Sequence, residues 1–358
     1  MPPPPLPPRP AADLPRLITY YQTHHDSAGK PISVLPLVTQ PGIALTHLIL
    51  AAIHINDEPS ALTLNDHAPH HARFQTLWAE MRVLQASGVK VMGMLGGAAK
   101  GSYERLDGDD AQFERYYAPV RDLIRERGLD GLDLDVEEDM SLGGVIRLID
   151  RLRADFGPSF IITLAPVAAA LLSPLNNLSG FDYEALEVMR GRDVAWYNAQ
   201  FYCGWGDCTS PAMYEVMLGK GWPPEKVVVG LVTNPENGPG FVPWEILRGV
   251  FRLLRERYPR FGGVMGWEYF NGSPGGRERP WEWARRMTEL LGRTESRRTN
   301  AGGPAGSAAV AVAQPKQEML ERKGSDPSVV DDAIDGEGHA MNVPVPRQFD
   351  YYSDGVDD

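Results

Sequence analysis

Three acidic residues occupy every second position in the segment 130–139, which reads Asp-Gly-Leu-Asp-Leu-Asp-Val-Glu-Glu-Asp. Side chains alternate between the two faces of a β-strand, so Asp133, Asp135 and Glu137 are predicted to share one face. The leucines and valine between them would share the opposite, apolar face. Burying carboxylates side by side is costly unless they share protons or gain partners, so such a row points to chemistry.

Crowded, buried carboxyl groups cannot all ionise, so the pKa of at least one is raised and a protonated acid can persist near neutral pH. Glu137 is the last of the row and is the predicted proton donor, with Asp135 beside it and Asp133 deeper. A calcium loop fits less well, because Gly131 follows the first Asp directly instead of standing at the sixth position. A solvated edge strand does not explain the purely apolar face opposite the acids.

The acidic segment belongs to a regular alternation of strand-like and helix-like segments. The strand-like segments are short, rich in Val, Ile and aromatic residues, and bounded by Gly, Pro or polar residues; they are 17–21, 45–55, 89–95, 131–136, 160–165, 194–202, 227–232 and 263–269. Helical patterns lie between most of them, as at 72–86, 111–127, 145–156, 244–258 and 281–291.

This alternation predicts an α/β fold, a (β/α)8 barrel (TIM barrel), whose chemistry belongs at the carboxyl ends of the strands. A doubly wound open sheet is the alternative. It is less favoured because no glycine-rich nucleotide-binding loop follows an early strand.

The run Asp130-Gly131-x-Asp133-x-Asp135-x-Glu137 resembles the D-G-x-D-x-D-x-E signature of family 18 glycoside hydrolases. This family comprises chitinases and endo-β-N-acetylglucosaminidases, and its signature occupies the fourth strand of a TIM barrel. The segment here is the fourth predicted strand, and the resemblance extends over about residues 17–292. We count Asp130, the first residue of the signature, among the predicted substrate-binding residues.

Two further segments resemble parts of the family's substrate site. Gly96 and Gly97 follow the third predicted strand as in the family's S-x-G-G segment, although Met94 stands where the Ser would be. A tight turn after a strand is the alternative reading of the paired glycines.

Gln200-Phe201-Tyr202 resembles the Q-x-Y-N pattern of the sixth strand, with Cys203 in place of the Asn. The resemblance implies that Gln200 and Tyr202 hold the N-acetyl group of the substrate. An aromatic core strand is the alternative.

Aromatic residues at the ends of the outer predicted strands complete the candidate site. Trp267 resembles the Trp of the eighth strand that forms the floor of the sugar subsite, where a flat ring suits the apolar face of a pyranose. A Trp buried for core contacts alone is the alternative. Tyr20 or Tyr21, at the end of the first strand, is expected to face the pocket, and we select Tyr21.

The resemblance implies a retaining, substrate-assisted mechanism, an exception to the use of two carboxylates by most glycosidases. The substrate's acetamido oxygen would attack the anomeric carbon and form an oxazolinium ion. Glu137 would protonate the departing oxygen and then activate water, Asp135 would bond the acetamido N–H with help from Asp133, and Tyr202 would orient the acetamido carbonyl. No metal or organic cofactor is required.

The implied substrate is β-1,4-linked N-acetylglucosamine in chitin or chito-oligosaccharides. The chitobiose core of N-glycans is an alternative substrate, and the enzyme would then be an endo-β-N-acetylglucosaminidase. A catalytically weak chitinase-like lectin on the same barrel is a second alternative, disfavoured because Glu137 is present.

Composition limits the partners and the location. The net charge of −12 argues against nucleic acid and anionic lipid, and we expect a monomer that binds an oligo- or polysaccharide containing N-acetylglucosamine.

No apolar run approaches the roughly 20 residues of a membrane span, and prolines fill the first ten residues where a signal peptide would be apolar. We therefore expect a cytoplasmic protein, with unconventional secretion as the alternative, and free thiols at Cys203 and Cys208.

The ends of the chain differ in composition from its middle. We predict a proline-rich disordered arm over residues 1–15, a catalytic domain over 16–293, and a disordered acidic tail over 294–358. His67, His70 and His71 are expected to form a solvated cluster and not a metal site.

Overall fold

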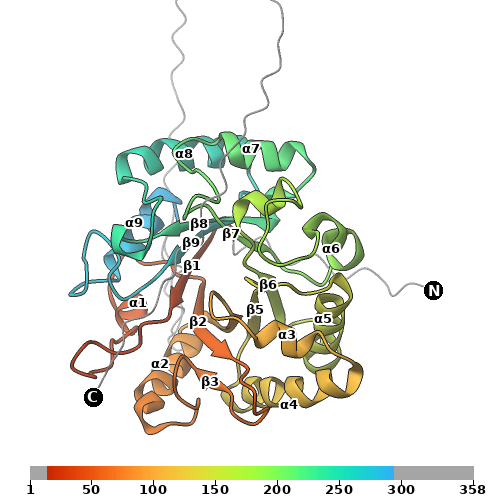
Figure 1. The fold of residues 1–358 in the computed structure, drawn as a ribbon. Helices are drawn as coiled ribbons and strands as arrows, with labels where there is room; N and C mark the ends of the chain where they lie inside the picture. Colours follow the sequence, from red (N-terminus) through yellow and green to blue (C-terminus); the bar gives the residue numbers. More distant parts are fainter. Residues whose placement is uncertain (1–13, 294–358) are drawn as a thin grey trace, which may run out of the picture. The chain divides into compact units, whose positions relative to one another are not determined.

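The computed structural model describes residues 14–293, and they contain a closed barrel of eight parallel strands surrounded by helices (Figure 1). Each barrel strand pairs with the next, and β1 pairs with both β2 and β9, which closes the sheet. The predicted (β/α)8 fold is confirmed. The strands are β1 (Arg16–Tyr21), β2 (His47–His54), β4 (Lys90–Gly96), β5 (Gly131–Asp135), β6 (Ile161–Leu164), β7 (Tyr197–Gln200), β8 (Val227–Val232) and β9 (Gly263–Trp267).

The acidic strand β5 is therefore the fourth strand of the barrel, as predicted. The remaining strand of the described residues, β3 (Thr63–Leu64), has two residues and pairs antiparallel with β2 outside the closed barrel.

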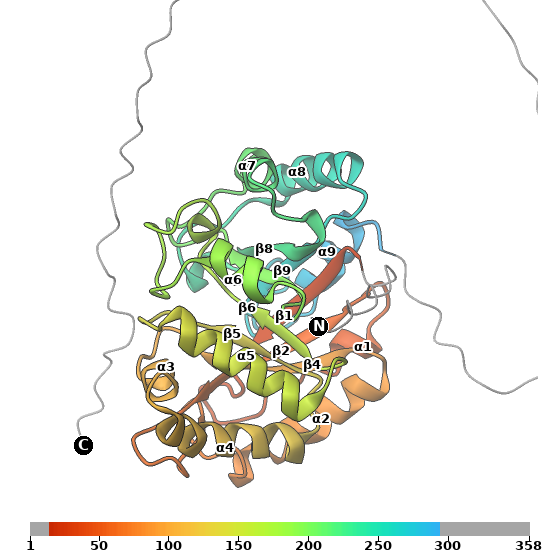
Figure 2. The same cartoon turned by 90° about the vertical axis from the view of Figure 1, so that its right-hand side faces the viewer.

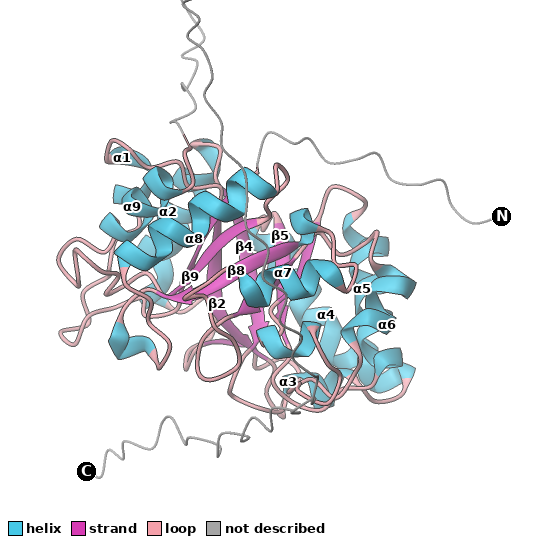
Figure 3. Cartoon of the chain, turned by 90° about the horizontal axis from the view of Figure 1, so that it is seen from above, coloured by secondary structure: helices cyan, strands magenta, loops and turns pink. Residues whose placement is uncertain are grey.

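Helices lie around the strands (Figure 3), with α7 and α8 on one side of the barrel and α4 on the other (Figure 2). Only a four-residue helix, α1, separates β1 from β2, whereas longer helices occupy most other connections. The helices are α1 (Pro36–Thr39), α2 (Gln75–Ala86), α3 (Ser102–Leu106), α4 (Asp110–Arg127), α5 (Leu142–Phe156), α6 (Tyr183–Arg190), α7 (Ala212–Gly219), α8 (Trp244–Arg257) and α9 (Glu282–Leu290).

The helices that flank β5 have clear start and stop signals. Asp109 caps α4 by accepting a hydrogen bond from Gln112 N, and Gly128 ends the helix in a left-handed conformation at φ 63°. Ser141 caps α5 in the same way by accepting from Gly144 N. The end of α4 at Gly128 and the start of α5 at Ser141 thus limit the segment in which β5 lies.

The core has two layers because side chains alternate along every strand. Leu132 and Leu134 of β5 belong to the larger cluster, which lies between the barrel and its helices. The smaller cluster fills the barrel interior and includes Ile18, Tyr20, Ile49, Met92, Met94, Trp196, Val228 and Met265. The acids of β5 point into this interior layer.

The predicted arm and tail lie almost entirely outside the described residues, so their expected disorder stays a prediction. Within residues 14–293, no helix is long and apolar enough to cross a membrane. Cys203 and Cys208 are both free thiols.

Candidate active site

The three predicted acids form a row that runs from the barrel interior to its mouth. Asp133 is fully buried, Asp135 is 5% exposed, and Glu137, just beyond the end of β5, is half-buried. Gly131 makes this strand possible, because a Cβ there would overlap the carbonyl oxygen of Ile161 on β6. The row therefore depends on a close approach of two strands at their amino ends.

Uncharged donors from three other strands surround Asp133. Tyr20 Oη donates to its Oδ2 at 2.7 Å, while Thr163 Oγ1 at 2.5 Å and Asn198 Nδ2 at 3.0 Å both donate to its Oδ1. Burial raises the pKa of Asp133 above its ordinary value, and these three hydrogen bonds offset part of that rise. The deepest acid thus has several contacts that favour its ionised form.

The amide of Gln200 joins the two outer acids. Its Nε2 lies 3.2 Å from Asp135 Oδ1, 3.2 Å from Glu137 Oε1 and 2.9 Å from the carbonyl oxygen of Ala165. Burial, followed by the charges of Glu137 and Asp133, raises the pKa of Asp135 well above its usual range. Burial also raises the pKa of Glu137, while the Gln200 hydrogen bond lowers it. This pair can therefore hold a proton near neutral pH.

The two glycines at the end of β4 let the chain pass close to Asp135. Gly96 and Gly97 both have left-handed φ angles, 91° and 92°, and Gly97 N donates to the Asp135 carbonyl at 2.9 Å. A Cβ on Gly96 would lie 2.5 Å from that carbonyl oxygen, and one on Gly97 would lie 3.6 Å from Asp135 Oδ2. Gly97 therefore borders the carboxylate, and Met94 lies in the barrel interior.

Aromatic side chains line the interior beside the acids. The rings of Tyr20 and Trp267 lie 5.5 Å apart, and Trp267 stays partly exposed at the end of β9. Tyr202 is 7% exposed. Burial, then the charges of Asp135 and Glu137, raise the pKa of its phenol well above the usual range, which keeps the hydroxyl protonated. The predicted Gln200, Tyr202 and Trp267 thus all lie at the interior, near the acid row.

The prediction of Tyr21 as a pocket residue is wrong, because Tyr20 occupies that position. Tyr21 points to the helix-side cluster, where its hydroxyl donates to the Ile32 carbonyl at 2.5 Å and its ring contacts Tyr269. Adjacent residues of a strand face opposite sides, so only one of the two tyrosines can face the acids.

The prediction that Asp130 binds substrate is also wrong. Asp130 precedes β5 at the amino end of the barrel, whereas the acid row ends at the carboxyl end. Its Oδ1 pairs with Lys90 Nζ at 2.9 Å, and its Oδ2 accepts from Val91 N and Gln85 Nε2, each at 2.9 Å. These bonds fasten β5 to β4 and α2, so the residue has a structural role.

Sequence reasoning missed Thr163 and Asn198, both fully buried against Asp133. Each carries a signal that could have found it. Thr163 is a polar residue in the otherwise apolar β6, and Asn198 lies two positions before Gln200 and so shares its strand face.

The neighbouring acid Glu138 faces away from the row. It is 8% exposed and accepts hydrogen bonds from Gly101 N at 2.6 Å and Tyr103 N at 2.8 Å, at the start of α3. It therefore anchors the loop that follows β4 and the two glycines.

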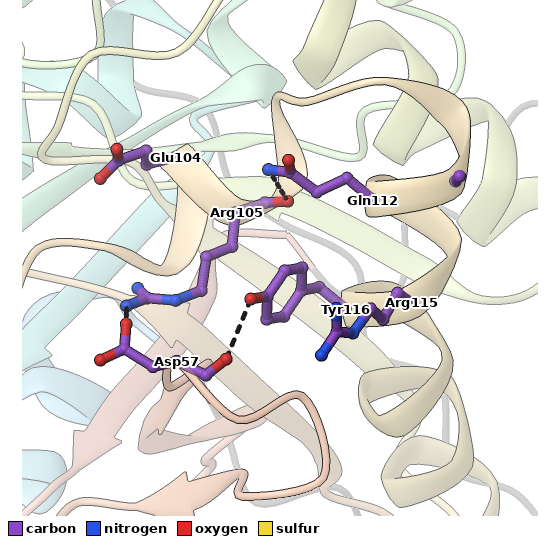
Figure 4. A pocket seen from close by; sticks show the side chains of 7 residues that line it. Asp57, Glu104, Arg105, Gln112, Arg115 and Tyr116 are labelled. Atoms are coloured by element: carbon purple, nitrogen blue, oxygen red, sulfur yellow. Dashed lines mark hydrogen bonds and ion pairs between the residues drawn. The ribbon is translucent and has the colours of Figure 1, made fainter.

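A cavity of about 530 Å³ opens between α3, α4 and the loop that follows β2 (Figure 4). Its polar groups bond one another: Arg105 pairs with Asp57, Tyr116 Oη donates to the Asp57 carbonyl, and Gln112 Nε2 donates to the Arg105 carbonyl. None of the acids of the row lines it. The cavity is a junction between surface segments.

The histidines near residue 70 lie beside α2. His67 and His71 are ring neighbours at 4.9 Å, and His70 and His71 are exposed. Over residues 14–293, no group of three or more His, Cys, Asp or Glu side chains is arranged to hold a metal ion.

Comparison with known proteins identifies the family. The model of "Glycosyl hydrolases family 18" matches residues 16–237, which is more than half of the chain. The chain belongs to glycosyl hydrolase family 18. The predicted family, a group of glycosidases that hydrolyse O-glycosyl bonds, is thereby confirmed.

Similar solved structures include an endo-β-N-acetylglucosaminidase and a chitinase. A fungal endo-β-N-acetylglucosaminidase is 52% identical, with a TM-score of 0.76 over 78% of this chain and 99% of that chain. The chitinase ChiC from Aspergillus fumigatus is 57% identical, with a TM-score of 0.71 over 77% of this chain and 99% of that chain.

A curated relative, Chitinase 2 of Rhizopus oligosporus, is 29% identical over 210 residues, which is 53% of this chain. The aligned region spans 36% of that relative's length, so this chain matches about a third of a longer protein.

Proposed function

We propose that this domain hydrolyses β-1,4-linked N-acetylglucosamine in chitin or chito-oligosaccharides, with retention and by substrate-assisted catalysis. The observation that carries the proposal is the row on β5, in which Asp135 and Glu137 share the Gln200 amide at the barrel mouth. Membership of family 18 supports a nucleophile supplied by the substrate, because this family departs from the two-carboxylate mechanism.

The chemistry needs a proton on Glu137 and a negative charge on Asp135. Burial lets the pair hold one proton. An acetamido N–H that donates to Asp135 favours the carboxylate form of Asp135 and so leaves the proton on Glu137. Substrate binding then prepares the acid for its task.

Bond making and breaking follow from this placement. The acetamido carbonyl oxygen attacks the anomeric carbon, the glycosidic C–O bond breaks, and Glu137 gives its proton to the departing oxygen. The Glu137 carboxylate then takes a proton from water, which opens the oxazolinium ion at the anomeric carbon and restores the acetamide. Asp135 balances the positive charge that develops on the oxazolinium nitrogen.

The aromatic residues would hold the sugar that reacts. Trp267 is partly exposed beside Tyr20, so its ring can lie against the apolar face of a pyranose. The protonated hydroxyl of Tyr202 can donate a hydrogen bond to the acetamido carbonyl oxygen and orient it for attack.

The mechanism is tested with substrates that differ only at the acetamide. A fully de-N-acetylated oligomer should be cut very poorly, and a thiazoline analogue of the intermediate should inhibit cleavage of the acetylated oligomer. Efficient cleavage at a bond without an acetamide on the glycon side would contradict substrate assistance. It would require a protein nucleophile, for which Asp135 is the first candidate.

A second candidate function is cleavage of the chitobiose core of N-glycans. The 52% identity to a fungal endo-β-N-acetylglucosaminidase favours it as an alternative. Rates on chitin oligomers and on a high-mannose glycopeptide, measured with one preparation and with Glu137→Gln as the blank, distinguish the two. Binding of both without turnover of either would instead support a lectin.

A further inference from the structure

Behind the acid row, a buried indole determines which way a neighbouring amide points. Trp196 Nε1 lies 2.9 Å from Asn198 Oδ1, and both side chains are at most 1% exposed. An indole N–H can only donate, so it must meet the amide oxygen of Asn198. The Asn198 NH₂ group is therefore the part that faces Asp133, at 3.0 Å.

Trp196 is itself held in place near the bottom of the barrel interior. The Arg16 guanidinium lies 4.3 Å from the centre of its ring, and the His47 imidazole packs against it in an edge-to-face arrangement with the ring centroids 4.8 Å apart. These contacts come from β1 and β2, on the far side of the barrel from β7 in strand order. These contacts hold the indole in place, and the hydrogen bond from its N–H in turn holds the Asn198 amide in one orientation.

This fixed amide favours one protonation state of Asp133. The NH₂ group can donate to a carboxylate oxygen but cannot accept a proton from a carboxylic acid. Thr163 donates to the same Oδ1, and Tyr20 donates to Oδ2. A proton on Oδ1 would meet the amide NH₂, so protonation there costs a hydrogen bond.

We propose that Asn198, oriented by Trp196, is a positioning residue that keeps Asp133 ionised and so leaves the single proton of the row to Asp135 and Glu137. The inference rests on the proposed function, because it matters only if that proton does the chemistry. Asn198 acts through Asp133 and makes no contact with the reacting atoms.

Asp135 and Glu137, on the same segment as Asp133, are the groups that hold this proton. The other titratable groups that the described residues place around Asp133 are tyrosines, and burial raises their pKa, so they do not compete for it. They are Tyr20 from β1, Tyr103 from α3, Tyr183 from α6 and Tyr202 from the end of β7.

The positioning role of Asn198 is tested by the pH dependence of kcat/KM. Removing a donor from Asp133 destabilises its carboxylate, so the pKa of Asp133 rises and a second proton enters the row at higher pH. The acidic limb of the profile should therefore move to higher pH, by about one unit for Asn198→Leu. Thr163→Val keeps the shape of its side chain, removes the other donor to Oδ1 and should move the limb in the same direction.

A third variant and a control separate this effect from loss of stability. Trp196→Phe frees the Asn198 amide and should move the acidic limb less than Asn198→Leu, and the double variant should not move it further than Asn198→Leu alone. Val228→Ala removes buried volume from the same barrel interior without touching the row, since Val228 is fully buried there. It should lower the melting temperature and leave the limb in place.

The outcomes are distinguishable from those for the proposed function. If Glu137→Gln is inactive and folded Asn198→Leu and Thr163→Val keep the wild-type acidic limb, the positioning role is wrong and the proposed function stands. An equal shift in Val228→Ala also overturns the role. If Glu137→Gln keeps near-normal turnover, the proposed acid is wrong and the inference fails with it.

Discussion

The two ends of the acidic segment contain the same kind of residue in opposite circumstances. At the amino end, Asp130 faces the Lys90 ammonium and accepts hydrogen bonds from a backbone N–H and the Gln85 amide. At the carboxyl end, Asp135 and Glu137 share the amide of Gln200, burial raises the pKa of both, and the charge of Glu137 raises that of Asp135 further. The charge of Asp130 is balanced by its partners, so this residue stabilises the contact between strands. The charges of Asp135 and Glu137 are not balanced in this way, so the pair can hold a proton.

The comparison divides the sequence motif into two parts. Asp130 and Gly131 build the start of β5, the first by bonding to β4 and α2 and the second by admitting the backbone of β6. Asp133, Asp135 and Glu137 face the barrel interior and its mouth. A run of residues that looks uniform in sequence therefore has a structural half and a chemical half, and single substitutions can separate them.

The largest effect is expected at the mouth end. Glu137→Gln keeps the shape of the side chain and removes the proton, so turnover of chitin oligomers should fall by about 100- to 10,000-fold while oligosaccharide binding persists. Initial rates, calorimetric binding and a melting curve measure the three quantities. Glu138→Gln is the matched control, because the same change one residue later affects an anchor of the loop after β4 and should lower the melting temperature with little change in turnover. Near-normal turnover in Glu137→Gln would assign the acid elsewhere.

The next largest effect is expected at Asp135, which lies two residues before Glu137 and deeper in the barrel. Asp135→Asn removes the charge proposed to balance the oxazolinium ion, and one such contact is typically worth about 3 to 4 kcal/mol, or about 100- to 1,000-fold in kcat. Single-turnover rates on an acetylated oligomer measure the loss. A drop of tenfold or less would show that the charge of Asp135 does little in the transition state.

A smaller effect is expected from the aromatic wall. Tyr202→Phe removes one neutral hydrogen bond to the acetamido carbonyl and should lower kcat by about fivefold to tenfold. The ring and its buried contacts remain, so the melting temperature should hardly change. A loss as large as that of Asp135→Asn would mean that the hydroxyl has a further role at the reacting centre.

The alternation of side chains in β5 made the acid row predictable, but the same rule could not orient β1. The sequence Arg-Leu-Ile-Thr-Tyr-Tyr of β1 is buried on both faces, so no polar face shows which tyrosine points inward. The choice between Tyr20 and Tyr21 depends on the register of β1 against β2 and β9, which arises only when the barrel closes. In the closed barrel, the Tyr20 hydroxyl bonds to Asp133, although the two residues are 113 positions apart in the chain.

The partners of the acids were harder to predict than the acids themselves. Gln200 was found because it belongs to a recognisable pattern, whereas Thr163 and Asn198 become meaningful only where β6 and β7 lie beside β5 in the barrel. Asp130 was misassigned for the opposite reason. Its place in the motif suggested substrate, yet its distance along the strand from Glu137 already put it at the other end of β5.

The smallest effect on catalysis is expected at the amino end, and it gives the sharpest test of the division. Asp130→Asn removes the charge that pairs with Lys90, whose side chain is 54% exposed, and weakens the bonds to Val91 N and Gln85. Exposed pairs and single hydrogen bonds are each worth about 1 kcal/mol or less, so the melting temperature should fall by only a few degrees. The kcat and KM for chitin oligomers should stay at their wild-type values. Lys90→Met should cost about the same stability, and the double variant should cost less than the sum because one shared contact is lost in both. A clear loss of kcat/KM in Asp130→Asn at unchanged stability would break the comparison, because charge at the structural end of β5 would then influence the proton held at the other.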